Sequence, residues 1–192
     1  MKIAIFGGAF DPITIAHIAV CNYLIEKKIV DEVWVSPCYI SYYDKKMEHY
    51  DNRLEMCKIA VENNKNPKIK ANDYEIANKL CGESVDIMEK FIADYKEHQL
   101  YFVIGMDNAI KIMTWTGWEK LINMLPFIII PREGYVVDKN IWFQMTPHIY
   151  IKEYIANLIS STQARLELKN KGNTDLVDKL VVNYITDKQL YK

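Results

Sequence analysis

The segment KIAIFGGAFDPITIAH, residues 2–17, gives the clearest indication of how the chain folds. Its apolar run Lys2–Phe6 predicts a buried strand, and Gly7–Gly8 then leads into a segment where Thr14 can cap a helix. Glycines let the backbone pass close to a ligand because no Cβ is in the way. With Thr14 at the N-cap, His17 falls at position N3 beside free N–H groups. This layout aims the positive end of a helix at the end of the first strand, which is an anion site.

Strands and helices alternate along the rest of the chain. Further strands are expected near 33–36, 68–71, 101–104, 127–130 and 148–150, and helices near 17–27, 51–61, 84–95, 162–171 and 175–188, with a loop over 39–50. Three of the apolar strands are continuous rather than alternating, which is typical of parallel strands buried on both faces. We therefore expect an α/β fold of the Rossmann-like, doubly wound kind: a mostly parallel sheet with helices on both faces.

The length favours a single domain over residues 1–192, with a C-terminal helical part at about 160–192. Lys and Arg number 24 and Asp and Glu 25, so the net charge of −1 argues against a protein that binds nucleic acid through bulk charge. No apolar run approaches the ~20 residues of a membrane span, and the N-terminus does not resemble a signal peptide. The four cysteines are widely spaced, which favours reduced thiols. We expect a cytoplasmic protein that binds neither nucleic acid nor membrane.

The segment GGAFDPITIAH, residues 7–17, has an ordinary interpretation and a functional one. Two glycines after a strand usually form only a turn, and a histidine near a helix start is usually a surface or capping residue. The whole segment, however, resembles the G-G-x-F-D-P-x-[HT]-x-G-H signature of the nucleotidylyltransferase superfamily, which includes nicotinate (or nicotinamide) mononucleotide and pantetheine-phosphate adenylyltransferases. Thr14 is the residue usual in the pantetheine-phosphate enzymes, where nicotinate enzymes usually have His, and Ala16 replaces the usual Gly.

A second motif, ISSTQAR at residues 159–165, lies near the C-terminus. Hydroxyl residues before a helix are N-caps, and an arginine one turn into that helix suits polyphosphate. The ordinary alternative is a capped helix with an exposed Arg165. The segment nevertheless resembles the I-S-S-T-x-x-R motif of the same superfamily, so two motifs at opposite ends of the chain indicate one family.

Segments between the two motifs resemble the nicotinate mononucleotide adenylyltransferases in particular. The similar stretches are RLEM at 53–56, GESVD at 82–86, FVIGMD at 102–107, WTGWEKL at 115–121 and IIIPREGY at 128–135. The resemblance thus covers nearly the whole chain. Pantetheine-phosphate adenylyltransferases lack the tryptophan region and remain the alternative, as does another adenylyl- or cytidylyltransferase of the superfamily. A non-catalytic nucleotide-binding module is the third option. Loss of His17 or Arg165 would have favoured it, but both residues are present.

The resemblance implies that an adenylyl group passes from ATP to nicotinate mononucleotide, giving deamido-NAD⁺ and pyrophosphate in NAD biosynthesis. It implies that His17, Thr14 and Arg165 are the catalytic groups, acting on the phosphates. The residues expected to bind ATP are Gly7, Gly8, Ala9, Phe10, Gly105, Asp107, Ile159, Ser160 and Ser161. Direct in-line attack needs no covalent enzyme intermediate, and no nucleophilic constellation stands out in the sequence.

Lys45, Ser84, Trp115 and Arg132 are expected to bind the pyridine mononucleotide. A flat ring can stack on Trp115, although this residue could equally be a core tryptophan. Lys45 follows Asp44 where the family usually has P-H-K, and a solvated loop is the alternative there. No dedicated metal site is expected, so Mg²⁺ would arrive with ATP. The preference between nicotinate and nicotinamide stays open, and a homo-oligomer is one option because the family's enzymes vary in assembly.

Overall fold

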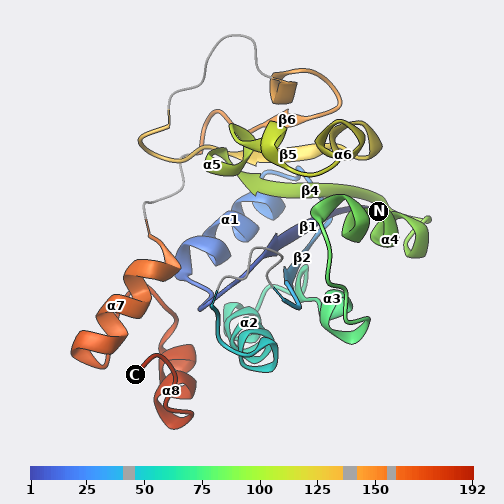
Figure 1. Ribbon diagram of the computed structural model, residues 1–192. Helices are drawn as coiled ribbons and strands as arrows, with labels where there is room; N and C mark the ends of the chain where they lie inside the picture. The colour runs from blue at the N-terminus through green and yellow to red at the C-terminus, as the bar shows by residue number, and fades with distance from the viewer. Residues whose placement is uncertain (41–45, 136–141, 155–158) are drawn as a thin grey trace.

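The computed structural model describes residues 1–40, 46–135, 142–154 and 159–192, and its strands form one six-stranded sheet (Figure 1). The strands are β1 (Lys2–Gly8), β2 (Glu32–Pro37), β3 (Ile69–Ala71), β4 (Gln99–Gly105), β5 (Phe127–Ile130) and β6 (Ile149–Tyr150). Their order across the sheet is β3-β2-β1-β4-β5-β6, and every neighbouring pair is parallel. This is the strand order of Rossmann folds, so the predicted doubly wound α/β class is confirmed.

Helices cover both faces of the sheet. One face packs against α1 (Ile15–Glu26), α2 (Tyr50–Asn64), α7 (Ser161–Lys171) and α8 (Lys179–Asp187). The opposite face packs against α4 (Ser84–Asp94), α5 (Met106–Ala109), η1 (Ile112–Thr114), α6 (Trp118–Met124) and η2 (Trp142–Gln144), while the short helix α3 (Tyr74–Ala77) follows β3. None of the helices that the structure describes has the length and apolar character that a membrane span requires.

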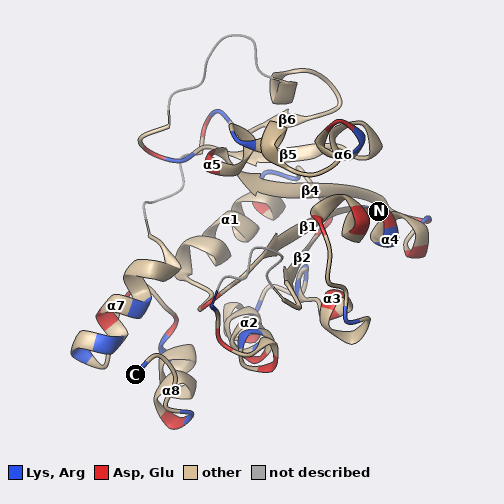
Figure 2. Ribbon diagram, viewed as in Figure 1, with Lys and Arg blue, Asp and Glu red and all other residues tan. Residues whose placement is uncertain are grey.

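The buried strands divide their side chains between two hydrophobic cores. Along β1, Ala4 points into the core under α1 and α2, whereas Ile3 and Ile5 point into the core under α4 and α6. Because successive strand residues face opposite sides, a strand covered on both sides needs an unbroken apolar run, as the sequence shows. Figure 2 shows residues of both charge signs on α2, α4 and α7, in keeping with the near-zero net charge.

Arg53 on α2 joins the loops that follow β1 and β2. Its side chain is 1% exposed, and its guanidinium donates to the carbonyl oxygens of Glu48 (2.9 Å), Ala9 (2.7 Å), Cys38 (2.6 Å) and Tyr39 (3.0 Å). The remaining N–H points at Cys38 Sγ, 3.6 Å away. All five donors of the planar fork therefore have acceptors, and a buried cation holds two loops in one position.

We predict that Arg53→Lys lowers the free energy of unfolding by about 3 kcal/mol, because an ammonium group cannot reach four carbonyl oxygens in a fork geometry. Urea denaturation followed by circular dichroism measures the change. Lys58→Met on the exposed side of the same helix is the control, and it should stay within about 0.5 kcal/mol of wild type. Equal stability of the Arg53→Lys variant and wild type would contradict this role.

Candidate active site

A cavity of about 530 Å³ lies at the carboxyl ends of β1 and β4, where the strand order reverses. Ligands of doubly wound folds bind at this point of the sheet, and the volume suits a small-molecule site. The residues predicted for ATP or mononucleotide binding that line the cavity are Gly7, Gly8, Ala9, Phe10, Ser84, Gly105, Asp107, Trp115, Arg132, Ile159, Ser160 and Ser161, together with His17. The fold thus brings both predicted binding regions to one cavity.

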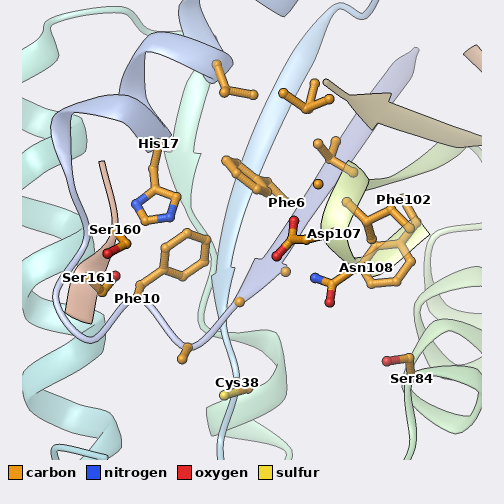
Figure 3. Close-up of a pocket in the computed structure, with 18 of the residues that line it drawn as sticks. Phe6, Phe10, His17, Cys38, Ser84, Phe102, Asp107, Asn108, Ser160 and Ser161 are labelled. Carbon is orange, nitrogen blue, oxygen red and sulfur yellow. The ribbon is translucent and has the colours of Figure 1, made fainter. Parts of the chain in front are cut away.

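The loop after β1 forms one wall of the cavity (Figure 3). A Cβ on Gly7 would lie 3.1 Å from the Phe102 ring, and one on Gly8 would lie 3.2 Å from the Phe10 ring. Phe10 has a φ of 47°, in the left-handed region that few side chains adopt. Its ring packs edge-on against His17, with 5.1 Å between the ring centroids. The loop and the imidazole are therefore packed as one unit.

His17 presents one particular ring nitrogen to the cavity. Its Nδ1 accepts a hydrogen bond of 2.9 Å from the Thr14 backbone N–H. A neutral imidazole that accepts at Nδ1 carries its proton on Nε2. Burial first, and the positive charge of Arg132 second, together lower the pKa of His17 to about 4. At neutral pH, His17 is therefore an uncharged group whose Nε2–H is its remaining donor.

Thr14 lies behind His17 rather than on the wall of this cavity. Its side chain is 2% exposed, and its hydroxyl lies 2.8 Å from His17 Nδ1. Both the backbone and the side chain of Thr14 thus meet the same nitrogen and orient the imidazole. A direct action of the Thr14 hydroxyl on the phosphates, which the family resemblance implies, stays a prediction.

The start of α7 forms a second wall of the cavity. Ser160 is its N-cap, and the Ser160 hydroxyl accepts a 3.1 Å hydrogen bond from the Gln163 N–H. The Ser161 hydroxyl donates to the carbonyl oxygen of Pro12 at 2.8 Å, so α7 is fixed to the loop after β1. Figure 3 shows both serines on the same side of the cavity as His17 and Phe10. A helix N-terminus and an imidazole donor thus border the same space, as an anion site requires.

Arg165 does not line the cavity. Its Nη1 donates to the carbonyl oxygen of Asp11 at 2.7 Å and lies 3.6 Å from the Asp11 carboxylate. Its Nη2 donates to Thr162 Oγ1 at 3.3 Å, and Thr162 lines the cavity. Contact with a phosphate through Nη1 would require that nitrogen to leave Asp11.

At the end of β4, Asp107 and Arg132 form an ion pair inside the cavity. Arg132 Nη1 lies 3.1 Å from Asp107 Oδ2, and each side chain is partly exposed. From the sequence, Asp107 is expected to bind ATP and Arg132 the mononucleotide. Their contact places these two groups side by side on the cavity wall, and the positive charge of Arg132 contributes to the lowered pKa of His17.

The far end of the cavity is formed by the start of α4 and by Trp115. Ser84 is the first residue of α4, and Trp115, which follows η1, packs against the core on that face of the sheet. Both residues line the cavity, so Trp115 serves the core and the wall at once. Lys45 lies outside the described residues, and its neighbour Lys46 is exposed.

Glu75 on α3 is a cavity residue that sequence reasoning missed. It is 4% exposed, and its Oε2 has no hydrogen-bond partner among the residues that the structure describes. Burial raises the pKa of this carboxyl to about 7, against the opposing effects of the Tyr39 N–H, the Arg53 charge and the Ser36 hydroxyl. No motif or spacing in the sequence predicts that Glu75 is buried in the cavity. Its surroundings include the loops after β1 and β2 that Arg53 joins, and these are distant from Glu75 in the sequence.

Within the described ranges, no group of three or more His, Cys, Asp or Glu residues could hold a metal ion. The arrival of Mg²⁺ with ATP therefore stays a prediction. The domain boundaries and the oligomeric state stay predictions as well.

Comparison with known proteins agrees with this site. The cytidylyltransferase-like family model matches residues 5–167. A protein of Fusobacterium nucleatum named "Probable nicotinate-nucleotide adenylyltransferase" is 34% identical over 96% of this chain and 97% of its own length. The Bacillus subtilis protein named "Nicotinate-nucleotide adenylyltransferase" is 29% identical over 100% of this chain and 98% of its own.

A solved structure matches over the same extent. Plasmodium falciparum nicotinic acid mononucleotide adenylyltransferase complexed with NaAD has a TM-score of 0.82 and 29% sequence identity, covering 99% of this chain and 97% of its own. The resemblance drawn from the two terminal motifs is thereby confirmed. The chain belongs to the cytidylyltransferase-like family, with the nicotinate-nucleotide adenylyltransferases as its relatives.

Proposed function

We propose that this chain joins ATP and nicotinate mononucleotide to form deamido-NAD⁺ and pyrophosphate. One observation carries the proposal. The Nε2 side of His17 and the N-terminus of α7 border the same cavity, whose other end is formed by Trp115 and the start of α4. Polyphosphate fits the first end and a flat ring the second, and the relatives named above carry this activity in their names.

The reaction is a direct displacement at phosphorus. An oxygen of the mononucleotide 5′-phosphate bonds to the α-phosphorus of ATP, and the bond from that phosphorus to the β-bridging oxygen breaks as pyrophosphate leaves. The attacking oxygen is already ionised at neutral pH, so no general base is needed. Cys38 lines the cavity, but burial raises the pKa of its thiol, which therefore stays protonated and a poor nucleophile. Mg²⁺ enters as part of the ATP substrate.

His17 stabilises the charge that develops on the phosphate oxygens. In our proposal its Nε2–H donates to the α- and β-phosphates, and Thr14 keeps that nitrogen aimed by occupying Nδ1. A neutral donor fixed before the substrate arrives needs no reorganisation during the reaction. The N-terminal N–H groups of α7 and the Arg165 guanidinium, once turned from Asp11, hold the phosphates that leave.

The mononucleotide binds at the opposite end. We assign its ring to Trp115 and its anionic groups to the start of α4 at Ser84, with Lys45 and Arg132 as further donors. The charge of Arg132 is offset by the Asp107 carboxylate, with which it forms an ion pair. In our proposal Arg132 therefore contributes a directed hydrogen bond more than a net positive charge. The second candidate is pantetheine-phosphate adenylyl transfer, which Thr14 favours.

Incubation with ATP-Mg²⁺ and one acceptor at a time tests the function. The acceptors are nicotinate mononucleotide, nicotinamide mononucleotide and 4′-phosphopantetheine, and pyrophosphate release is measured. We expect release with nicotinate mononucleotide, and the amide is the comparison that ranks the two pyridines. Release with 4′-phosphopantetheine alone would contradict the proposal and establish the second candidate.

His17→Ala should lower kcat by about 10²-fold or more, because a preorganised donor to the developing charge is lost. Steady-state kinetics with saturating ATP and mononucleotide measures the effect, and circular dichroism checks the fold. His98→Ala is the matched control. His98 stacks on Tyr95 just before β4, at the other end of the strand from the cavity, so its loss should leave kcat unchanged. Normal turnover in a folded His17→Ala protein would remove His17 from the site.

A further inference from the structure

We infer that Tyr191, which follows α8, is a positioning residue for the nucleotide-binding loop after β1 and acts through Asp11. The inference rests on the proposed binding of ATP against that loop. The Tyr191 hydroxyl donates to Asp11 Oδ1 at 2.7 Å, across a separation of 180 residues. Asp11 lies directly between Phe10, which lines the cavity, and Pro12, whose carbonyl oxygen Ser161 holds.

The chain after α8 is shaped to bring Tyr191 to this position. Gln189 has a φ of 57° and Tyr191 a φ of 61°, both in the left-handed region that costs a non-glycine residue energy. The Leu190 N–H donates to the carbonyl oxygen of Ile185 at 3.0 Å, and both Leu190 and Tyr191 pack against the core under α1 and α2. Surrounding contacts therefore compensate an unfavourable backbone that places one hydroxyl on Asp11.

Asp11 receives donors from three parts of the chain. Its side chain is 3% exposed. Oδ1 accepts from Tyr191 and from the Glu48 N–H at 3.2 Å, and Oδ2 lies 3.6 Å from Arg165 Nη1. Burial, and then the negative charge of Asp11, raises the pKa of Tyr191, so the phenol keeps the proton that it donates. The loop is thus anchored at Asp11, while its neighbour Phe10 lines the cavity.

The Tyr191 hydroxyl matters most for the position of Asp11 if Arg165 leaves this carboxylate. If Arg165 turns to the phosphates when ATP binds, the buried Asp11 carboxylate loses its cation. A buried carboxylate without donors is costly. Tyr191 and the Glu48 N–H then remain as its described donors, so the hydroxyl keeps the loop in place during the step in which Phe10 and His17 face the nucleotide.

Tyr191→Phe removes this hydroxyl and keeps the ring. We expect the Kd for ATP, measured by calorimetry, to rise by about 10-fold, the effect of one hydrogen bond to a charged group. Hydrogen exchange at the amides of residues 8–14 should become faster in the free protein. Tyr184→Phe is the matched control, because the Tyr184 hydroxyl ties α8 to Asn52 on α2 at 2.9 Å without touching the loop. This control should change neither quantity.

A double-mutant cycle with Asp11→Ala tests whether Tyr191 affects ATP binding through Asp11. If Tyr191 acts through Asp11, the double variant should bind ATP as Asp11→Ala alone does. Additive effects, or a Tyr191→Phe protein that matches Tyr184→Phe in both readouts, would overturn the inference. If the wild-type protein binds no ATP, the proposed function fails, and the exchange rates at residues 8–14 then decide on Tyr191 alone.

Discussion

The hydrogen bond from the Thr14 N–H to His17 Nδ1 decides what the cavity can do. It leaves the proton on Nε2 and turns that nitrogen toward the ligand space. A protonated imidazole would place an N–H against the Thr14 N–H, so the same contact opposes charging of the ring, in the direction of the lowered pKa. Under the proposed function, an anionic substrate would therefore meet fixed dipoles, namely the imidazole and the N-terminal ends of α1 and α7.

Two buried charged groups keep this donor in place. Arg53 joins the loop after β1, through the Ala9 carbonyl oxygen, to the loop after β2, through the Cys38 carbonyl oxygen. Asp11 ties the loop after β1 to α7 and to the chain after α8. The two groups play complementary roles. Arg53 donates hydrogen bonds to carbonyl oxygens, and the Asp11 carboxylate accepts them from Tyr191 and from the Glu48 N–H. The loop after β1 is therefore held by contacts with distant segments of the chain as well as by its own backbone.

The sheet could be predicted from the sequence because continuous apolar runs and their order carry that information. Its strands fall close to the predicted ranges; the strand expected at 68–71 is β3 at Ile69–Ala71. The helix expected from 175 begins at Lys179 instead, because Asp178 accepts from the Leu180 N–H and caps it there. The four-residue helices α3 and α5 were not predicted, since one turn has no hydrophobic period to detect.

Site residues that lie at strand ends or helix starts could be predicted from the sequence. The positions of side chains that depend on contacts with distant residues could not. Glycines at the ends of β1 and β4 and hydroxyl residues before α7 reach the cavity because parallel strands and helix starts share one edge of the sheet. The position of Arg165 on Asp11 and the burial of Glu75 depend on contacts between distant segments, which no local pattern encodes.

The protonation state of His17 tests this account most directly. Nitrogen-15 NMR of the imidazoles, with His17 assigned by its absence from a His17→Asn variant, reports on each ring nitrogen as pH changes. We expect Nε2 to stay protonated and Nδ1 to stay unprotonated from about pH 8 down to about pH 5, because the pKa lies near 4. We also expect ATP-Mg²⁺ to shift the Nε2 signal. A midpoint near the ordinary histidine value of about 6.5, with no response to ATP, would contradict it.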